Sequence, residues 1–362
     1  MNKNAKLLYA TSITYPSILA NRIQTLEMSK EFSKQLGFDN FILGGRDIIE
    51  QEKINVKNIR GSMKSYFLAL KYLFLVKNKK ITHIFCREEK LLFFMLLYNK
   101  LFFHLPIKFI YEAHWVLKNT FWYLFLLRKI DFIMAINNIV KEKLVDKFII
   151  SKNKILVASN GVNLKKFDLD LFKEDARERL NLPLDKKIIL YTGHLYDWKG
   201  AQVLADSSQF LKKNIIIIFV GGRERDIISF RENNRKYSNV LILGSVLHQE
   251  IPFYLKSADI LLLPNIPISQ ESINYTSPIK MFEYMASKRP IIASDLPSIR
   301  EILNENNSIL VEPDSPQRLA QGISELLGNE ELMKKILKNA YVDVQNYTWE
   351  RRVKKIINFI NK

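Results

Sequence analysis

Short apolar runs alternate with longer segments of helical periodicity along the whole chain. The runs are five to eight residues long, as in KLLYAT (6–11) and IIIIFVGG (215–222). Between them, apolar residues recur every three to four positions, which is the spacing of one face of an α-helix. Strands that alternate with helices in this way are typical of an α/β protein built on parallel sheets.

The predicted strands form two series, one in each half of the chain. Each series supplies about six β-α units, so the sequence predicts two Rossmann-like domains with a cleft between them. In the first half the predicted strands are residues 6–11, 41–45, 54–59, 81–86, 107–113, 131–136 and 154–159. In the second half they are residues 187–193, 215–222, 240–244, 259–264, 290–294 and 308–312.

Two boundaries divide the chain. The turn-rich polar stretch SNGVNLKKFDLD (159–170) separates the two series of strands. We therefore assign residues 1–160 to an N-terminal domain and residues 161–347 to a C-terminal domain. Residues 348–362 predict an amphipathic helix, which we expect to pack back across the junction of the two domains. Its apolar stripe consists of Trp349, Val353, Ile356, Ile357 and Ile360.

The composition is that of a globular protein in a reducing compartment. The 362 residues are 48% hydrophobic, which is enough for two domains with separate cores. The single cysteine, Cys86, excludes a disulfide framework. No apolar stretch approaches the roughly 20 residues that span a bilayer, and the N-terminus lacks the pattern of a signal peptide. We therefore expect a cytoplasmic protein.

The net charge of +18 is concentrated in the first part of the chain. Residues 1–160 hold 26 Lys/Arg and 12 Asp/Glu, whereas residues 161–362 hold 29 and 25. Nucleic acid, anionic lipid or an acidic substrate would each explain this excess, and so would a solvated basic face. No nucleic acid is expected as a partner, because the basic half lacks a recognisable recognition module.

Two segments of the basic half combine aromatic and basic residues. They are KSYFLALKYLFLVKNKK (64–80) and KLLFFMLLYNKLFF (90–103). One interpretation places them on an anionic membrane surface. The other makes them core helices of a Rossmann-like domain, whose lysines extend their ammonium groups to water. Both interpretations remain open.

Four strands of the second half end in glycine or proline, at Gly193, Gly222, Gly244 and Pro264. In open α/β sheets ligands bind beyond such ends, where glycine lets the backbone approach a ligand closely. Four of them together predict a nucleotide cleft. No G-x-G-x-x-G follows the first strand and no Walker A sequence is present, which disfavours a nicotinamide cofactor.

The stretch GHLYDWKG (193–200) follows the first of these strands. Lys199 precedes Gly200 at the start of the next predicted helix, where a cation and helix N–H groups can share a phosphate. On spacing alone, a solvated lysine in a turn is an equally good interpretation.

One acid, Glu283, lies on the short helix predicted within SPIKMFEYMASKRPIIASD (277–295). Ser277 suits the cap of this helix and Pro278 its first turn. Apolar residues at helical spacing then form a packing face, and Glu283 lies beside that face. We expect its carboxylate to be half-buried, so that it needs hydrogen-bond donors. An ion pair with Lys280 or Arg289 is the purely structural alternative.

Five stretches together resemble the family 4 glycosyltransferases of the GT-B fold, within the glycosyl transferases group 1. They occur in the family's order at residues 12–37, 160–162, 193–200, 240–264 and 277–303. The resemblance implies a retaining transfer of a sugar from a nucleotide-sugar donor, with no bound metal and no other cofactor. It also implies that the N-terminal domain binds the acceptor and the C-terminal domain binds the donor.

The family pattern assigns roles to three residues of the donor site. Glu283 matches the second acid of the E-x7-E motif, whose carboxylate holds the ribose hydroxyls. Lys199 matches the phosphate-binding lysine. His194 stands where the family has an arginine, and Arg223 is our prediction for the missing cation.

The remaining donor-site residues are predicted from the same resemblance. Backbone N–H groups of Ile279 and Lys280 would meet the diphosphate. Tyr275 stands at the first acid of the motif, which leaves the sugar undetermined, and Asn274 or Tyr275 would contact the sugar hydroxyls instead. The predicted site further includes Gly193, Gly222, Gly244, Val246 and Ser277.

His114, in IYEAHWV, matches the family's first-domain histidine that faces the reacting sugar. Trp115 stands where an acid often follows. A D-x-D pattern at Asp168 and Asp170 resembles the metal site of other transferases, but it lies in the linker, and we interpret it as solvated.

These features predict a metal-independent, retaining hexosyltransferase with catalytic residues His114, Lys199 and Glu283. The donor would be a UDP- or GDP-sugar, and the acceptor a glycan or a lipid-linked molecule of cell-surface polysaccharide or glycolipid synthesis. The protein would be cytoplasmic or peripheral on the cytoplasmic face of the membrane. Two alternatives remain: a nucleotide-sugar-binding protein without activity, and a nucleotide-sugar epimerase of the GT-B fold.

Overall fold

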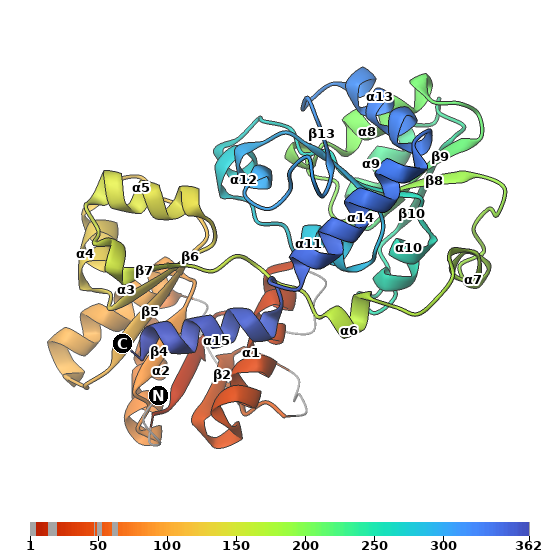
Figure 1. The fold of residues 1–362 in the computed structure, drawn as a ribbon. Helices are drawn as coiled ribbons and strands as arrows, with labels where there is room; N and C mark the ends of the chain where they lie inside the picture. The colour runs from red at the N-terminus through yellow and green to blue at the C-terminus, as the bar shows by residue number, and fades with distance from the viewer. Residues whose placement is uncertain (1–4, 14–19, 47, 49–52, 60–63, 362) are drawn as a thin grey trace. The chain divides into compact units, whose positions relative to one another are not determined.

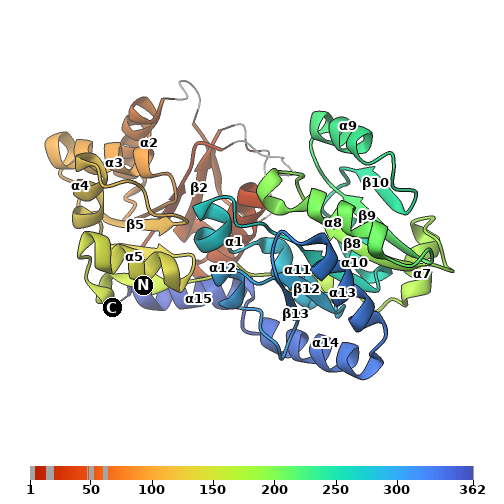
Figure 2. The same ribbon diagram turned by 90° about the horizontal axis from the view of Figure 1, so that it is seen from above.

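The structure, a computed structural model, describes residues 5–13, 20–46, 48, 53–59 and 64–361. It divides the chain into two compact units (Figures 1 and 2). Unit 1 consists of Met1–Asn160 and Trp349–Lys362, and unit 2 of Gly161–Thr348. The opening stretch that resembles the family at residues 12–37 lies partly outside the described residues, and its described part includes helix α1.

Unit 1 contains a seven-stranded parallel sheet in the order β3-β2-β1-β4-β5-β6-β7. The strands are β1 (Leu7–Ala10), β2 (Phe41–Gly45), β3 (Val56–Asn58), β4 (His83–Cys86), β5 (Lys108–Ala113), β6 (Phe132–Ala135) and β7 (Ile155–Val157). The helices are α1 (Ala20–Leu36), α2 (Ser65–Lys79), α3 (Glu89–Tyr98), α4 (Phe121–Lys129), α5 (Asn138–Phe148) and α15 (Trp349–Ile360). The π-helical turn η2 (Asn99–Phe103) extends α3.

The helices of unit 1 form two layers. Helices α2, α3 and α4 pack beside one another, and α1 packs beside α15 on the other side of the sheet (Figure 2). The chain end therefore belongs to unit 1, although the whole of unit 2 separates α15 from β7. The expectation that this helix also packs across the junction stays a prediction.

Unit 2 contains a six-stranded parallel sheet in the order β10-β9-β8-β11-β12-β13. The strands are β8 (Lys187–Thr192), β9 (Ile215–Val220), β10 (Val240–Gly244), β11 (Ile260–Leu263), β12 (Ile291–Ser294) and β13 (Ile309–Val311). The helices are α6 (Leu164–Phe167), α7 (Lys173–Arg179), α8 (Ala201–Ser207), α9 (Glu224–Asn233), α10 (Ile251–Ser257), α11 (Ile279–Ala286), α12 (Pro297–Arg300), α13 (Pro316–Leu327) and α14 (Glu330–Val344).

The core of unit 2 lies on both faces of its sheet. Successive residues of β8 alternate between two clusters: Ile188 and Leu190 pack in one, Ile189 and Tyr191 in the other. The first cluster also contains apolar residues of α10, α11 and α14, and the second contains those of α8, α9 and α13. A strand buried on both faces needs apolar residues at every position, which explains its unbroken apolar run.

The predicted fold class is confirmed. Each predicted strand contains a strand of the structure, and both sheets are parallel throughout. Among the described helices, none is both long enough and apolar enough to cross a bilayer. The linker pattern at Asp168 and Asp170 is not simply solvated, because Asp168 pairs with Lys288 at 2.7 Å and accepts a 2.6 Å hydrogen bond from Tyr341.

Candidate functional site

The carboxyl ends of β8, β9 and β10 meet through glycine turns. Gly221 donates to the Gly244 carbonyl at 2.6 Å, and a Cβ atom at Gly221 would lie 2.5 Å from the Gly193 carbonyl. At Gly200 a Cβ atom would lie 1.7 Å from the carbonyl of Pro264. A side chain at either position would force these backbone segments apart. Glycine at these turns therefore permits a close approach of backbone segments, and the predicted close approach of a ligand stays a prediction.

The loop after β8 presents Lys199 on an aromatic surface. Its ammonium nitrogen lies 3.8 Å from the centroid of the Trp198 ring, where a cation is attracted by the ring face. Burial lowers the pKa of Lys199 to about 8, while the charge of Glu271 acts in the opposite direction. A half-buried cation favours a bound anion, because the anion offsets the partial loss of hydration.

His194 lies in the same loop, with its ring stacked on Tyr196 at 5.0 Å between centroids. The Tyr191 hydroxyl donates a 2.5 Å hydrogen bond to the His194 carbonyl and so ties the loop to β8. Burial, followed by the charges of Arg223 and Lys199, lowers the pKa of His194. His194 is therefore neutral at pH 7, and it cannot replace the charge of the arginine that the family pattern has here.

Arg223 follows β9 and has an exposed side chain. Its guanidinium donates a 2.6 Å hydrogen bond to the Tyr196 hydroxyl and lies 5.2 Å from the centroid of that ring. The structure thus places Arg223 near the loop that holds His194 and Lys199. In this arrangement the Arg223 guanidinium already has a hydrogen-bond partner, the Tyr196 hydroxyl.

Helix α11 begins at Ile279, and Pro278 is the residue that precedes it. The prediction that Ser277 caps this helix is therefore wrong, because Pro278 takes that position and has no side-chain acceptor. Six of the seven residues from Ile279 to Met285 are buried. The exception, Lys280, projects its aliphatic chain past Gly193, where a Cβ atom would lie 3.8 Å from both Cδ and Nζ of the lysine.

Glu283 is more buried than its position on the helix predicted, with 6% of its surface exposed. Its Oε1 lies 2.7 Å from Nε2 of His248, in the segment between β10 and α10. The alternative ion pairs are wrong: the Lys280 ammonium has no hydrogen-bond partner among the described residues, and Arg289 donates to the Lys256 carbonyl. The predicted need for donors is met, in part, by His248.

Three polar groups in this part of unit 2 are buried without a hydrogen-bond partner among the described residues. They are the Nζ of Lys280, the Nδ1 of His194 and both amide atoms of Asn265. Asn265 follows β11 and is 0% exposed. Buried polar groups are normally paired, so unpaired ones at strand ends indicate a place where a polar ligand binds.

The other predicted residues lie on neighbouring segments. Asn274 and Tyr275 belong to the π-helical turn η6 (Glu271–Tyr275), where Asn274 donates to Gln270 at 2.7 Å. The Ser245 hydroxyl donates to the Gly222 carbonyl, which ties the end of β9 to the segment that contains Val246. Val246 packs against the apolar cluster that also contains residues of α11, and its assignment to the donor site stays a prediction.

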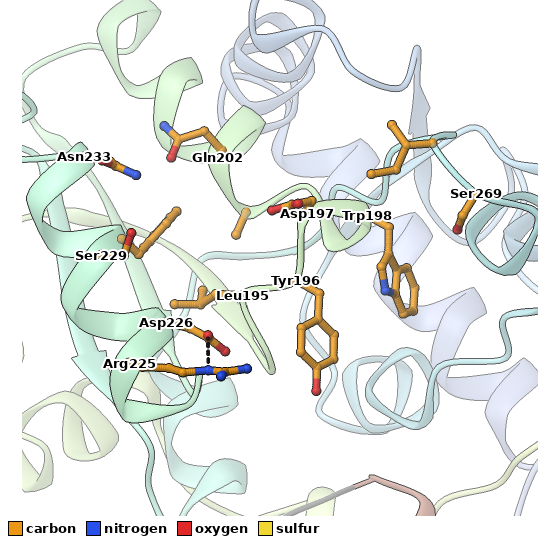
Figure 3. Close-up of a pocket in the computed structure, with 13 residues that line it drawn as sticks. Leu195, Tyr196, Asp197, Trp198, Gln202, Arg225, Asp226, Ser229, Asn233 and Ser269 are labelled. Carbon is orange, nitrogen blue, oxygen red and sulfur yellow. Dashed lines mark ion pairs between the residues drawn. The ribbon is translucent and has the colours of Figure 1, made fainter.

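A hollow of about 920 Å³ lies beside the loop that carries Lys199 (Figure 3). Residues 195–198, α8 and α9 line it, and Arg225 and Asp226 form an ion pair at its edge. Lys199, Lys280 and Glu283 are not among its lining residues. This hollow is therefore distinct from the cluster of unpaired polar groups.

In unit 1, His114 follows β5 and lies beside a fully buried carboxylate. Its Nε2 is 3.4 Å from Oε2 of Glu112, whose other oxygen is 2.6 Å from the guanidinium of Arg352 on α15. Gln24 of α1 also donates to Glu112, at 3.0 Å, and in turn accepts from Arg87 at 2.9 Å. Sequence reasoning identified only the histidine of this network.

Electrostatics determine the protonation states of this network. Burial and the charge of Arg87 lower the pKa of His114 to about 4, so the imidazole is neutral at pH 7. Burial alone would raise the pKa of Glu112, but the charge of Arg352 holds it well below its usual range. Glu112 is thus an ionised carboxylate that lies beside the His114 ring. Among the described residues, no three metal-ligating side chains gather into a metal site.

Comparison with solved structures identifies the class of fold to which this chain belongs. The structure of Anabaena Alr3699/HepE in complex with UDP matches with a TM-score of 0.79 and 16% identity, covering 98% of this chain and 99% of that chain. The chain therefore has the GT-B fold of glycosyltransferases.

The sequence comparisons show similarity to a family over part of the chain. Residues 186–329 match the family described as glycosyl transferases group 1. An uncharacterized glycosyltransferase of Methanocaldococcus jannaschii is 27% identical over 62% of this chain and 58% of its own length. The N,N'-diacetylbacillosaminyl-diphospho-undecaprenol alpha-1,3-N-acetylgalactosaminyltransferase of Campylobacter jejuni is 28% identical over 55% of this chain and 52% of its own length. The chain thus spans somewhat more than half the length of these relatives. The resemblance to this group of transferases is confirmed, and the finer assignment to family 4 stays a prediction.

Proposed function

We propose that this protein is a retaining glycosyltransferase that takes a sugar from a UDP- or GDP-sugar. The observation that carries the proposal is the cluster formed by Lys199, Lys280 and the Glu283–His248 pair. It lies within the region that matches the transferase family. Two ammonium groups, that of Lys280 buried and that of Lys199 half-buried, suit a diphosphate, and a buried carboxylate beside them suits the two hydroxyls of a ribose.

The diphosphate is the leaving group, and its developing charge is the main obstacle to reaction. As the bond between C1 of the sugar and the phosphate oxygen breaks, Lys199 neutralises the charge that builds on the diphosphate. The acceptor oxygen bonds to C1 on the same face, and its proton passes to the departing phosphate oxygen. This sequence keeps the configuration at C1 and needs no bound metal. Neutral His114 orients the donor sugar or the acceptor.

A screen of donors tests the proposal. The protein is heated with UDP, GDP and the common UDP- and GDP-sugars, since a ligand that binds the native form raises the melting temperature. The donor that stabilises the protein is then offered with glycan and polyprenyl-diphosphate acceptors, and the anomeric configuration of the product is read by NMR. Binding without transfer would instead support the alternative of a nucleotide-sugar-binding protein without activity. The presence of Tyr275 in place of the first acid of the motif favours that alternative. Conversion of the sugar without an acceptor would support the epimerase.

The contact between His248 and Glu283 gives a first prediction. His248→Phe removes the hydrogen bond to a buried carboxylate, which we expect to weaken binding of the stabilising nucleoside diphosphate about tenfold. His248→Gln can still donate and serves as the control. Calorimetry measures both variants, and equal affinity of His248→Phe and the wild type would show that His248 does not hold Glu283 for the ligand.

The acceptor side of the proposal involves unit 1 and an anionic membrane surface. Residues 53–130 contain 15 Lys/Arg and three Asp/Glu, and none of the three acids, Glu88, Glu89 and Glu112, is exposed. Large aromatic side chains on the same segments are exposed: Phe67, Phe74 and Phe102 are 48%, 56% and 68% exposed. Exposed aromatics among lysines suit the headgroup layer of an anionic bilayer, where a lipid-linked acceptor would reside.

Exposed residues of α2, of the position just before it and of η2 form one surface, which we call the aromatic-basic face. It consists of Lys64, Phe67, Lys71, Phe74, Lys77, Lys100, Leu101 and Phe102. Ring contacts join its parts, since Phe74 meets Phe103 at 5.2 Å and Phe102 meets Tyr98 at 6.2 Å between centroids. Helix α2 packs directly on α3, which η2 extends, so these residues share one side of unit 1.

A flotation assay tests this face. We expect the protein to float with phosphatidylcholine vesicles that contain phosphatidylglycerol, and to stay at the bottom with phosphatidylcholine alone. The double variant Phe67→Ser/Phe74→Ser should lose most of the flotation. A matched pair on unit 2, Phe172→Ser/Phe210→Ser, removes two rings that are also exposed and should float like the wild type. Absence of flotation in the wild type would favour the interpretation as core helices of a Rossmann-like domain, whose lysines extend their ammonium groups to water.

A further inference from the structure

The ammonium group of Lys280 is the least satisfied charge in the donor site. Its nitrogen is buried and has no hydrogen-bond partner among the described residues. It lies 3.7 Å from the centroid of the Tyr191 ring, whose face attracts a cation. A buried ammonium without a paired acid is costly, and proteins retain one chiefly where a ligand supplies the missing charge.

The charges around Lys280 make this cost larger. Burial lowers the pKa of Lys280 well below its usual value, and the charge of Lys199 lowers it further, while Glu283 acts in the opposite direction. The same two lysines, together with Arg223, lower the pKa of His194. Several basic groups therefore lie close together at the carboxyl end of β8 and the start of α11, and their positive charges repel one another. Such an arrangement is expected of a site that binds an anion.

We infer that Lys280, rather than Arg223, provides the second cation that binds the diphosphate of the donor. This inference rests on the proposed function and deepens it. The family pattern leaves His194 in the place of an arginine, and Lys280 reaches the same strand end from α11, beside Gly193. The guanidinium of Arg223 is exposed and already bonded to Tyr196.

The inference predicts an unusual pair of effects for Lys280→Met. The variant should bind UDP or GDP, whichever stabilises the wild type, at least tenfold more weakly, because a charge-assisted contact is lost. The ligand-free variant should melt at a higher temperature than the wild type at pH 7. The sign follows from the lowered pKa: the unfolded chain binds a proton at this lysine more readily than the folded chain, so charging it opposes folding. A lysine with a purely structural role would lower the melting temperature when removed.

Calorimetry and thermal melting test the inference with four proteins and two probes, the nucleoside diphosphate and inorganic pyrophosphate. Lys288→Met is the matched control, because it removes a lysine just beyond the same helix whose ammonium is paired with Asp168 at 2.7 Å. Arg223→Met tests the rival assignment. Lys280→Gln replaces Lys280→Met if the latter does not fold.

The expected result is a loss of at least tenfold for Lys280→Met with both probes, a smaller loss for Arg223→Met, and affinity within about twofold for Lys288→Met. Unchanged affinity of Lys280→Met, or a larger loss for Arg223→Met, would overturn the inference while the proposed function stands. If the wild type binds neither UDP, GDP nor pyrophosphate, the proposed function itself fails.

Discussion

Lys199→Ala is expected to lower the turnover of sugar transfer by about 100- to 1,000-fold, the usual effect of removing one group that stabilises developing negative charge. The reason is that its ammonium, held on the Trp198 ring, is the cation placed to neutralise the departing diphosphate. Turnover with a saturating donor is the quantity to measure. Transfer at close to the wild-type rate would show that another group stabilises the leaving diphosphate.

A pH profile separates loss of charge from loss of structure at this position. The pKa of Lys199 is lowered to about 8, so the ammonium of the free protein loses its proton as the pH rises through that value. We expect kcat/KM to fall above about pH 8 in the wild type. In Lys199→Arg the charge persists to higher pH, and the fall should move upward or disappear. An identical fall in both proteins would assign this titration to a different group.

Arg352→Met is expected to destabilise unit 1 by about 3–5 kcal/mol, the usual cost of leaving one partner of a buried ion pair uncompensated. Both Glu112 and Arg352 are buried, and the guanidinium also donates to the Ala158 carbonyl at 3.0 Å. Thermal melting measures the effect. At about 2–4 °C per kcal/mol for a unit of this size, the transition of unit 1 should fall by about 10 °C.

An exposed pair on the same helix is the control for this prediction. Glu350 of α15 lies 3.8 Å from Lys34 of α1, and both side chains are more than 60% exposed. Glu350→Ala should change stability by less than about 1 kcal/mol, because exposed pairs contribute little. If Arg352→Met melts within a degree or two of Glu350→Ala, the network around Glu112 does not stabilise the unit.

Much of the fold could be predicted from the sequence because strand and helix patterns are local. The runs around β8 and β9 are apolar at almost every position, which only a strand covered on both faces requires. The assignment of α15 to unit 1 was harder to predict. Its apolar stripe shows that it packs somewhere, whereas its position beside α1 depends on Arg352 reaching Glu112, a contact between distant parts of the chain.

In the candidate site, too, the residues in local motifs could be predicted, whereas those that depend on contacts between distant parts of the chain could not. Lys199 and Glu283 were predicted from short motifs whose spacing is visible in the sequence. His248 was missed because its role arises from a contact with Glu283 across 35 positions, and no local pattern marks it. Asn265 follows a strand that ends in proline, a signal that could have identified it. The side chain of Lys280 was considered only as an ion-pair partner of Glu283, because the prediction for the donor site concerned its backbone.

The most direct test of the central claim is a crystal structure of the protein soaked with the nucleoside diphosphate that raises its melting temperature. The account predicts phosphate oxygens within hydrogen-bond distance of the ammonium groups of Lys199 and Lys280, and both ribose hydroxyls on the carboxylate of Glu283. A diphosphate bound elsewhere, with these three side chains unchanged and untouched, would contradict it.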